Sequence, residues 1–198
     1  MNDGEFREFF DQLPDGETQS VEWKSGRPFS DRAYRCKIVK AIIAMSNLAD
    51  GGRVLLGPTD GQRSVIAWSD PADIDSWTMD GLGGVLRSYC SEAPRVVLRR
   101  RRVEGGDLLE ISVSTFDALP TFCVKNSEGP AAGILYAGQI YVRAPGQASS
   151  APAGSQADMR PVFDLHFARA YQRVQGLGVA RETRVDLFAK RAKEFFET

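Results

Sequence analysis

The sequence has a single histidine and only three cysteines in 198 residues. Cys36, Cys90 and Cys123 are odd in number, lie far apart and form no Cys-x-x-Cys pair, which argues against a disulfide framework and against a zinc knuckle. We expect them to be small buried apolar residues. His166 falls on the apolar stripe of a helical stretch, and no serine or cysteine lies in a nucleophile motif. These features disfavour hydrolysis by a Ser-His or Cys-His pair.

Long apolar runs and targeting signals are also missing. No run approaches the roughly 20 apolar residues that a membrane-spanning helix needs. The first residues, Met-Asn-Asp-Gly-Glu-Phe-Arg, lack the basic-then-apolar order of a secretory signal. We therefore expect a cytoplasmic protein with no membrane partner. The segment 57–61 begins and ends with glycine but lacks the Gly-Lys-Ser ending of a phosphate loop, which disfavours ATP hydrolysis.

Strong net charge is the third absence. The chain has 25 Lys and Arg against 26 Asp and Glu, a formal net charge of −1 at pH 7. This balance argues against binding nucleic acid by bulk electrostatic attraction alone. The charges are unevenly spread, however, because residues 1–22 contain seven acids and one arginine, whereas five arginines fall within residues 95–102. A positive stripe is therefore compatible with the neutral total.

What is present is an ordinary globular composition, 42% apolar and 26% charged, in a chain long enough for one domain with a small appendage. Apolar residues recur at helical spacing in residues 5–13, 33–48 and 70–89. Alternation or short apolar runs typical of strands occur in residues 20–24, 54–56, 64–68, 95–103, 108–113 and 139–143. These patterns predict an α+β fold with a mixed sheet of about six strands and helices packed against it.

The C-terminal part of the chain has a different pattern. Residues 144–154 are rich in Ala, Pro, Ser and Gly, as in a linker or surface loop. Two apolar stripes at helical spacing follow, separated by glycines at 176 and 178: Phe163, Phe167, Ala170, Tyr171 and Val174, then Val185, Phe188, Ala192 and Phe195. We expect one domain over residues 1–157 and an extension of two helices over residues 158–198.

The functional prediction rests on four ionisable side chains in residues 17–61: Glu17, Glu22, Lys24 and Asp60. Glu22 and Lys24 share one strand face, and Glu17 lies just upstream. Asp60 joins them if the two short strands of this stretch pair side by side. Three carboxylates at one point repel one another unless a cation lies among them, and all-oxygen ligands favour Mg²⁺ or Mn²⁺.

Such a metal would polarise a phosphodiester oxygen and lower the pKa of a bound water, while Lys24 could neutralise charge on the phosphate. The structural alternative is that Glu17 caps a turn, Glu22 and Lys24 form a solvated pair, and Asp60 is a turn residue. Acidic residues are common in turns, so the pattern by itself leaves both interpretations open.

The arginine run also has two interpretations. In a strand, Arg99 and Arg101 point to one side and the neighbouring arginines to the other. One interpretation is a solvated edge strand protected by its charge. The other is a phosphate-tracking surface without base specificity, in which Arg95, Arg99, Arg101 and Arg143 contact a nucleic-acid backbone.

The order of these motifs resembles the Schlafen-type AlbA-like domain family. The resemblance is carried by residues 17–24 (Glu-x-x-x-Val-Glu-Trp-Lys), 44–52 (a helix end with asparagine before Gly-Gly), 55–61 (a strand entering Gly-x-x-Asp-Gly) and 140–143 (Ile-Tyr-Val-Arg). It covers roughly residues 15 to 155. Each motif is weak alone, and the combination is more specific.

The resemblance implies a nuclease centre of two glutamates and one aspartate that cuts structured RNA such as tRNA with a divalent metal. The matching positions are Glu17, Glu22 and Asp60, and Lys24 follows the second glutamate as in the family. It therefore implies a metal-dependent endoribonuclease with Mg²⁺ or Mn²⁺. The alternatives are a non-catalytic regulatory module that binds DNA or RNA, as described for many bacterial single-domain members, and an interaction domain of a longer protein.

The resemblance also bears on assembly. Vertebrate Schlafens join two such lobes into a horseshoe and bind a zinc ion with cysteines and histidine. This chain has one lobe, and its single His166 cannot complete such a zinc site. We therefore expect a homodimer, formed through the apolar C-terminal stripes.

Overall fold

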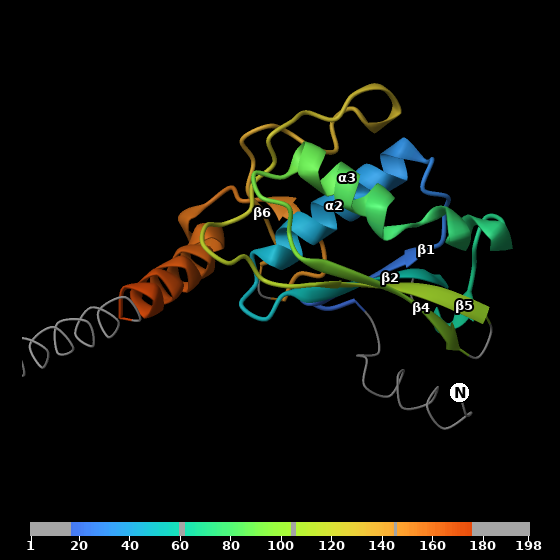
Figure 1. Cartoon of the computed structure of the whole chain (residues 1–198), viewed down its shortest axis with the longest axis horizontal. Helices are drawn as coiled ribbons and strands as arrows, with labels where there is room; N and C mark the ends of the chain where they lie inside the picture. The colour runs from blue at the N-terminus through green and yellow to red at the C-terminus, as the bar shows by residue number, and fades with distance from the viewer. Residues whose placement is uncertain (1–16, 60–61, 104–105, 145, 176–198) are drawn as a thin grey trace, which may run out of the picture.

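The fold is given by a computed structural model that describes residues 17–59, 62–103, 106–144 and 146–175. Its elements, in chain order, are β1 (Val21–Ser25), α2 (Arg32–Ser46), β2 (Gly52–Thr59), β3 (Gln62–Ile66), the 3₁₀ helix η1 (Pro71–Ser76), α3 (Met79–Tyr89), β4 (Val96–Val103), β5 (Gly106–Val113), the 3₁₀ helix η2 (Gly129–Ala131), β6 (Tyr141–Val142), β7 (Ala151–Pro152) and a helix over residues 156–175. Helices α2 and α3 lie on one face of the sheet (Figure 1). The predicted α+β class is confirmed.

The main sheet has the strand order β1-β2-β5-β4, with β3 paired to β2. β1 and β2 are parallel, with Glu22 opposite Val54 and Lys24 opposite Leu56, and α2 supplies the crossover that parallel neighbours need. β5 is antiparallel to both β2 and β4, so the sheet is mixed, as predicted. The interior position of β2 explains its unbroken run of apolar residues, because Val54, Leu55 and Leu56 are all fully buried.

Helix α2 is fixed at both ends. The Asp31 side chain caps its first turn by accepting a backbone hydrogen bond. After the helix, Gly51 has a φ of +69°, a conformation that favours glycine, and the chain turns into β2. The buried Asn47 amide donates to the carbonyls of Thr121 and Tyr141 and accepts from the Thr121 N–H. Asn47 therefore ties two distant segments of the chain to the end of α2.

Residues 70–89, expected as one helix, form η1 and α3 with a break between them. Trp77 is extended at the break, and Thr78 starts α3 as its N-cap, with its hydroxyl accepting from the Gly81 N–H at 3.1 Å. The buried Trp77 ring packs edge-on against Phe29 at a centroid distance of 5.0 Å. The break is thus stabilised by a cap and by a distant aromatic contact that the helical spacing does not reveal.

The strand predicted over residues 139–143 does not join the main sheet. Two of its residues form β6, which pairs with β7 in a separate two-stranded sheet. Tyr141 is fully buried against α2, and Asn47 bonds its carbonyl. The part of the chain that the structure describes therefore has one sheet of five strands and one of two, instead of a single sheet of about six.

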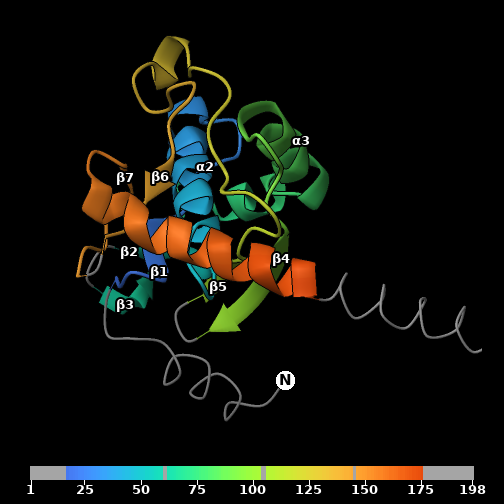
Figure 2. The same ribbon diagram turned by 90° about the vertical axis from the view of Figure 1, so that its left-hand side faces the viewer.

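The helix over residues 156–175 extends away from the body of the molecule (Figure 1), and in the turned view it runs across the end that faces the viewer (Figure 2). Near its start, Val162 packs in a small apolar cluster with Phe116 and Val142. Further along, His166 Nδ1 lies 2.9 Å from the Ala118 carbonyl oxygen. On another face, a stripe of apolar residues stays in solvent, with exposed fractions of 48%, 66%, 65% and 65% for Phe163, Phe167, Tyr171 and Val174.

Several predictions concern residues outside the described ranges. The helix expected over residues 5–13 and the second C-terminal stripe both lie there. The domain division at residue 157 stays a prediction. The three cysteines are free and buried, as expected. Among the described helices, none is both long enough and apolar enough to cross a membrane.

Candidate functional site

Glu17 lies at the free edge of β1, which is an outermost strand of the sheet. Backbone hydrogen bonds between Thr18 and Val21 turn the chain just before the strand. As a result, Glu17 Oε1 accepts a hydrogen bond from the Trp23 backbone N–H at 3.1 Å. An edge strand leaves such N–H groups without a neighbouring strand, so the carboxylate replaces that missing partner.

Lys24 joins the two glutamates predicted for the site. Its Nζ lies 3.1 Å from Glu17 Oε1 and 3.1 Å from Glu22 Oε1. Burial lowers the pKa of Lys24, but the negative charges of Glu22 and Glu17 outweigh burial and raise it above its ordinary value of 10.5. The structure therefore brings Glu17 and Glu22 together, and an ammonium group lies between them.

Arg143 completes this cluster from another part of the chain. We expected Arg143 on a nucleic-acid-binding surface, but its side chain is 0% exposed and is ion-paired with Glu22 Oε2. The guanidinium also donates to the Thr18 carbonyl at 2.7 Å and to Ser150 Oγ at 3.3 Å. Strand alternation could not show this burial, because the partners of Arg143 come from distant segments. Arg143 therefore does not lie on a nucleic-acid-binding surface as predicted, and it supports Glu22 instead.

A third cation faces Glu22 from α2. Burial lowers the pKa of Lys40, although the negative charge of Glu22 acts in the opposite direction. Lys40 Nζ lies 5.3 Å from the centre of the Tyr141 ring, a cation–π contact. Glu22 is therefore a buried carboxylate with positive groups on several sides, and Glu17 is the more exposed member of the pair, with side-chain exposures of 9% and 33%.

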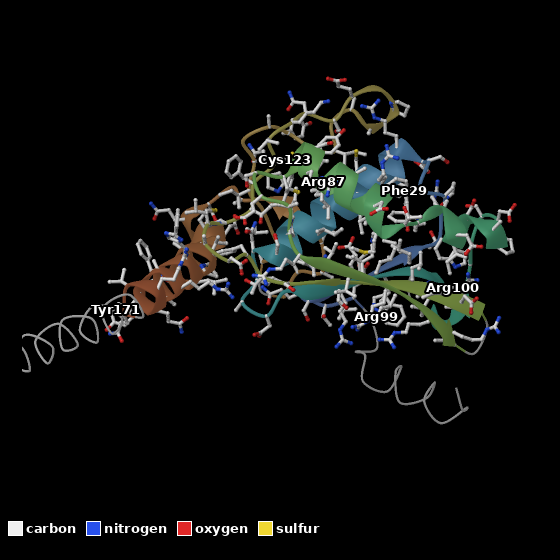
Figure 3. The ribbon with its side chains drawn as sticks, viewed as in Figure 1. Phe29, Arg87, Arg99, Arg100, Cys123 and Tyr171 are labelled. Atoms are coloured by element: carbon white, nitrogen blue, oxygen red, sulfur yellow. The ribbon has the colours of Figure 1, made fainter. Side chains whose placement is uncertain are left out.

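Two of the predicted arginines, Arg99 and Arg101, lie on the other edge strand, β4. Arg99 is exposed, extends from the sheet face opposite α2 (Figure 3), and has no ion pair with another described residue. Arg101 lies on the same face, half-buried, with Nε 2.9 Å from Glu110 Oε2. Arg53 of β2 approaches the other oxygen of Glu110 at 3.8 Å. Arg99 and Arg101 therefore lie on one side of the sheet, as strand alternation predicted.

Arg95 lies just before β4, with its side chain 72% exposed and ion-paired with Asp117. The remaining arginines of the run, Arg100 and Arg102, both pair with Asp107. β4 and β1 are separated by three strand spacings of about 4.8 Å, roughly 14 Å in all. The exposed arginines and the glutamate pair thus occupy opposite edges of one sheet and also its opposite faces, because Glu22 lies beside Val54 on the α2 face and Arg99 beside Glu110 on the other.

A comparison with protein families identifies the domain. A family model described as Schlafen, AlbA_2 matches residues 17–152. The chain belongs to this family. Schlafen AlbA_2 is a nucleic-acid-related family, and the match covers β1 to β7, including the glutamate pair and Arg143.

Other comparisons add less to this assignment. No curated protein matches the chain. Among solved structures, the chain is similar to the DIP2311 protein from Corynebacterium diphtheriae, with 22% sequence identity and a TM-score of 0.46. The match covers 74% of this chain and 25% of that one, so the chain spans a quarter of the length of its solved relative.

Asp60, the third carboxylate that the Schlafen resemblance implies, lies outside the described residues. Its prediction required the strand at 54–56 to pair beside the strand at 20–24, and this condition is confirmed by the parallel register of β1 and β2. At the end of that register Ser25 is opposite Gly57. Gly57 precedes Asp60 by three positions in the sequence.

The donor set can be tested against a divalent metal. Carboxylate oxygens suit Mg²⁺ and Mn²⁺, but the described residues contain no group of three or more potential ligands that could bind a metal ion. Both Glu22 oxygens already face protein cations, and Glu17 Oε1 accepts from Trp23 and Lys24. The two glutamates of this Schlafen chain thus supply oxygens of the kind that a divalent cation prefers, and the Lys24 ammonium occupies the position between them.

Two supporting residues were missed by sequence reasoning. Glu110 is 3% exposed and joins Arg101 to Arg53, and the available signal was a lone charge inside the apolar run 108–113. Asn47 was noted as part of a motif, but its role in tying residues 121 and 141 to α2 was not predicted. Both roles depend on long-range partners, which a local pattern does not identify.

Proposed function

We propose that this Schlafen AlbA_2 chain is a divalent-metal-dependent endoribonuclease that acts on tRNA-like structured RNA. In this proposal Glu17, Glu22 and Asp60 bind Mg²⁺ or Mn²⁺, and Lys24 assists. The observation that supports it is the convergence of Glu17 and Glu22, whose carboxylates lie 3.1 Å from the same ammonium nitrogen. Two carboxylates brought to one cation position are the core of a hard-metal site.

The residues have separate roles. When bound, the metal would polarise a phosphodiester oxygen and lower the pKa of a water molecule. Glu17, the more exposed glutamate, can orient the attacking group from the edge of β1. Lys24 is 28% exposed and can reach a phosphate to neutralise charge that develops during cleavage. Arg143 acts only through Glu22 and is a positioning residue.

RNA would be bound by the arginines on and just before β4. Arg99 offers an exposed guanidinium without a competing partner among the described residues, and Arg95 offers one with a solvent-exposed partner. Arg101 contributes positive charge, partly balanced by Glu110. Contacts of this type go to phosphates and give affinity without base specificity. We assign Arg143 no phosphate contact, because it is buried.

A second candidate is a non-catalytic regulatory module that binds DNA or RNA. One observation favours it: Lys24 and Arg143 already balance the charges of Glu17 and Glu22. In that case the cluster only fixes Arg143 and Ser150 beside β1, and the exposed arginines alone carry function. The two candidates share a nucleic-acid-binding surface and differ in catalysis.

We also propose that two copies of the chain associate through the helix over residues 156–175. The exposed stripe of Phe163, Phe167, Tyr171 and Val174 is a continuous apolar surface on a helix that leaves the body. Isolated apolar side chains on a surface are ordinary, but a stripe of four large ones indicates an interface. A dimer would supply the second lobe that the horseshoe arrangement requires.

The deciding experiment is incubation of the full chain with tRNA, with and without Mn²⁺. The nuclease proposal expects cleavage that needs Mn²⁺, is lost in Asp60→Ala and is kept in Asp80→Ala. Asp80 is a matched control because it is an exposed aspartate in the first turn of α3. RNA binding without cleavage by the wild-type chain would support the regulatory module instead.

A further inference from the structure

The glutamate pair is already neutralised by its own protein. Two carboxylates, Glu17 and Glu22, are matched by two cations, Lys24 and Arg143, within direct contact distance. A divalent cation added to this arrangement would meet the ammonium group and the guanidinium as like charges. Its entry therefore requires one of the two protein cations to leave.

Arg143 is the cation that cannot leave easily. Its side chain is 0% exposed, and besides Glu22 it donates to Ser150 Oγ, to the Thr18 carbonyl and, at 3.5 Å, to the Val21 carbonyl. Moving the guanidinium would break these hydrogen bonds and leave the buried Glu22 carboxylate with Lys24 as its one ion-pair partner among the described residues, which is costly. Arg143 is therefore part of the fixed frame of the site.

Lys24 is the cation that can leave. Its side chain is 28% exposed, and its acceptors are Glu17, Glu22 and the Trp23 carbonyl at 3.3 Å. A lysine ammonium is a compact charge on a flexible four-carbon stem, so it can move into water by rotation about side-chain bonds. Its departure would remove the ammonium from one oxygen of each glutamate, and Glu17 Oε1 would keep only its bond from the Trp23 N–H, so both oxygens could approach a single shared cation.

We propose that the Lys24 ammonium is a tethered competitor of the divalent cation, and that metal entry between Glu17 and Glu22 displaces Lys24 toward the solvent side of the site. This inference rests on the proposed metal-dependent function. The displaced ammonium is then available to a phosphate of the nucleic acid. One side chain thus neutralises the site in the free protein and contacts substrate in the loaded one.

The exchange has a thermodynamic consequence. A phosphate that binds the displaced ammonium lowers the free energy of the metal-bound arrangement, so metal and RNA promote each other's binding. Such coupling is reciprocal, because each ligand must change the affinity of the other by the same factor. The free protein therefore binds the metal weakly until RNA is present.

The first test uses the wild-type chain and measures how fast each lysine is acetylated, by mass spectrometry, with MgCl₂ or with NaCl at equal ionic strength. If Mg²⁺ displaces Lys24, the acetylation rate of Lys24 rises severalfold in MgCl₂ and the acetylation rate of Lys125 does not change. Lys125 is a suitable reference because it is an exposed lysine far from β1 in sequence. An unchanged or slower rate at Lys24 would overturn the proposal.

The second test measures Mn²⁺ affinity by titration calorimetry for the wild type, Lys24→Met and the control Lys125→Met. Removal of the tethered competitor predicts binding roughly tenfold tighter in Lys24→Met, within the usual range of coupling between sites, and no change in the control. Equal or weaker binding by Lys24→Met overturns the exchange. If Lys24→Met does not fold, the acetylation rates of the wild type decide.

Failure of the exchange and failure of the nuclease are distinguishable. Mn²⁺-dependent cleavage of tRNA, together with unchanged Mn²⁺ affinity in Lys24→Met, overturns the exchange and leaves the nuclease intact. Tighter Mn²⁺ binding by Lys24→Met, with no cleavage by the wild type, supports the exchange and overturns the nuclease.

Discussion

Arg143 and Glu22 are 121 positions apart in the sequence, and their side chains form a buried ion pair. The pair joins the segment that follows β6 to the edge strand β1. The pair holds Arg143 in place against Glu22. Lys24 is therefore the cation in direct contact with the two glutamates that is able to move.

Arg143→Met is expected to lower the free energy of unfolding by about 3 kcal/mol, because it leaves the buried Glu22 carboxylate without its main partner. Urea unfolding followed by circular dichroism measures the change. Arg95→Met is the matched control, since Arg95 forms an ion pair in solvent and should cost little. Equal stability of Arg143→Met and wild type would show that the pair is not a structural support.

Arg99→Ala is expected to weaken binding of structured RNA and to reduce the salt dependence of the affinity by roughly one phosphate contact. The reason is that Arg99 is exposed and has no ion pair among the described residues. Fluorescence anisotropy at several salt concentrations gives both quantities. Arg87→Ala, an exposed arginine near the end of α3, is the control. If both variants bind equally, β4 is not the RNA surface.

Phe167→Glu is expected to convert a dimer into a monomer, because it places a charge in the apolar stripe of the helix over residues 156–175. Sedimentation equilibrium at micromolar concentration gives the mass. Tyr136→Glu is the control, since Tyr136 is an exposed aromatic, 49% accessible, on a loop. A monomeric wild-type chain under these conditions would contradict the interface.

The charge of Lys24 predicts a pH dependence. Its folded pKa is raised above 10.5, so its ion pairs with the ionised glutamates stabilise the fold fully from neutral pH up to about that value. The contribution is lost as the pH rises through the raised folded pKa. We expect the difference in unfolding free energy between wild type and Lys24→Met to stay constant from neutral pH to about 10 and to shrink above 10.5. A difference that shrinks already near neutral pH would contradict the raised pKa.

The sequence predicts most strongly what depends on neighbouring residues. Alternation in 20–24 placed Glu22 and Lys24 on one strand face, and the apolar run at 54–56 indicated an interior strand; both agree with the structure. Long-range partners were not predictable. Arg143 follows the same alternating pattern as an exposed strand residue, and only the fold shows that Glu22 and the Thr18 carbonyl surround it.

The same limit explains the other differences. The helical spacing of residues 70–89 continues through Trp77, although capping by Thr78 and burial of the indole break the helix there. The segment 139–143 has ordinary strand composition. Tyr141 nevertheless packs against α2 and bonds to Asn47 outside the main sheet. In each case a tertiary contact outweighed a local preference.

The most direct measurement is a crystal structure of the chain with Mn²⁺, in which anomalous scattering locates the metal. We predict a peak that contacts one carboxylate oxygen each of Glu17 and Glu22, with Lys24 Nζ no longer within contact distance of both and with Arg143 still paired to Glu22. A peak elsewhere, or Lys24 still bridging the two glutamates at saturating Mn²⁺, would contradict the account.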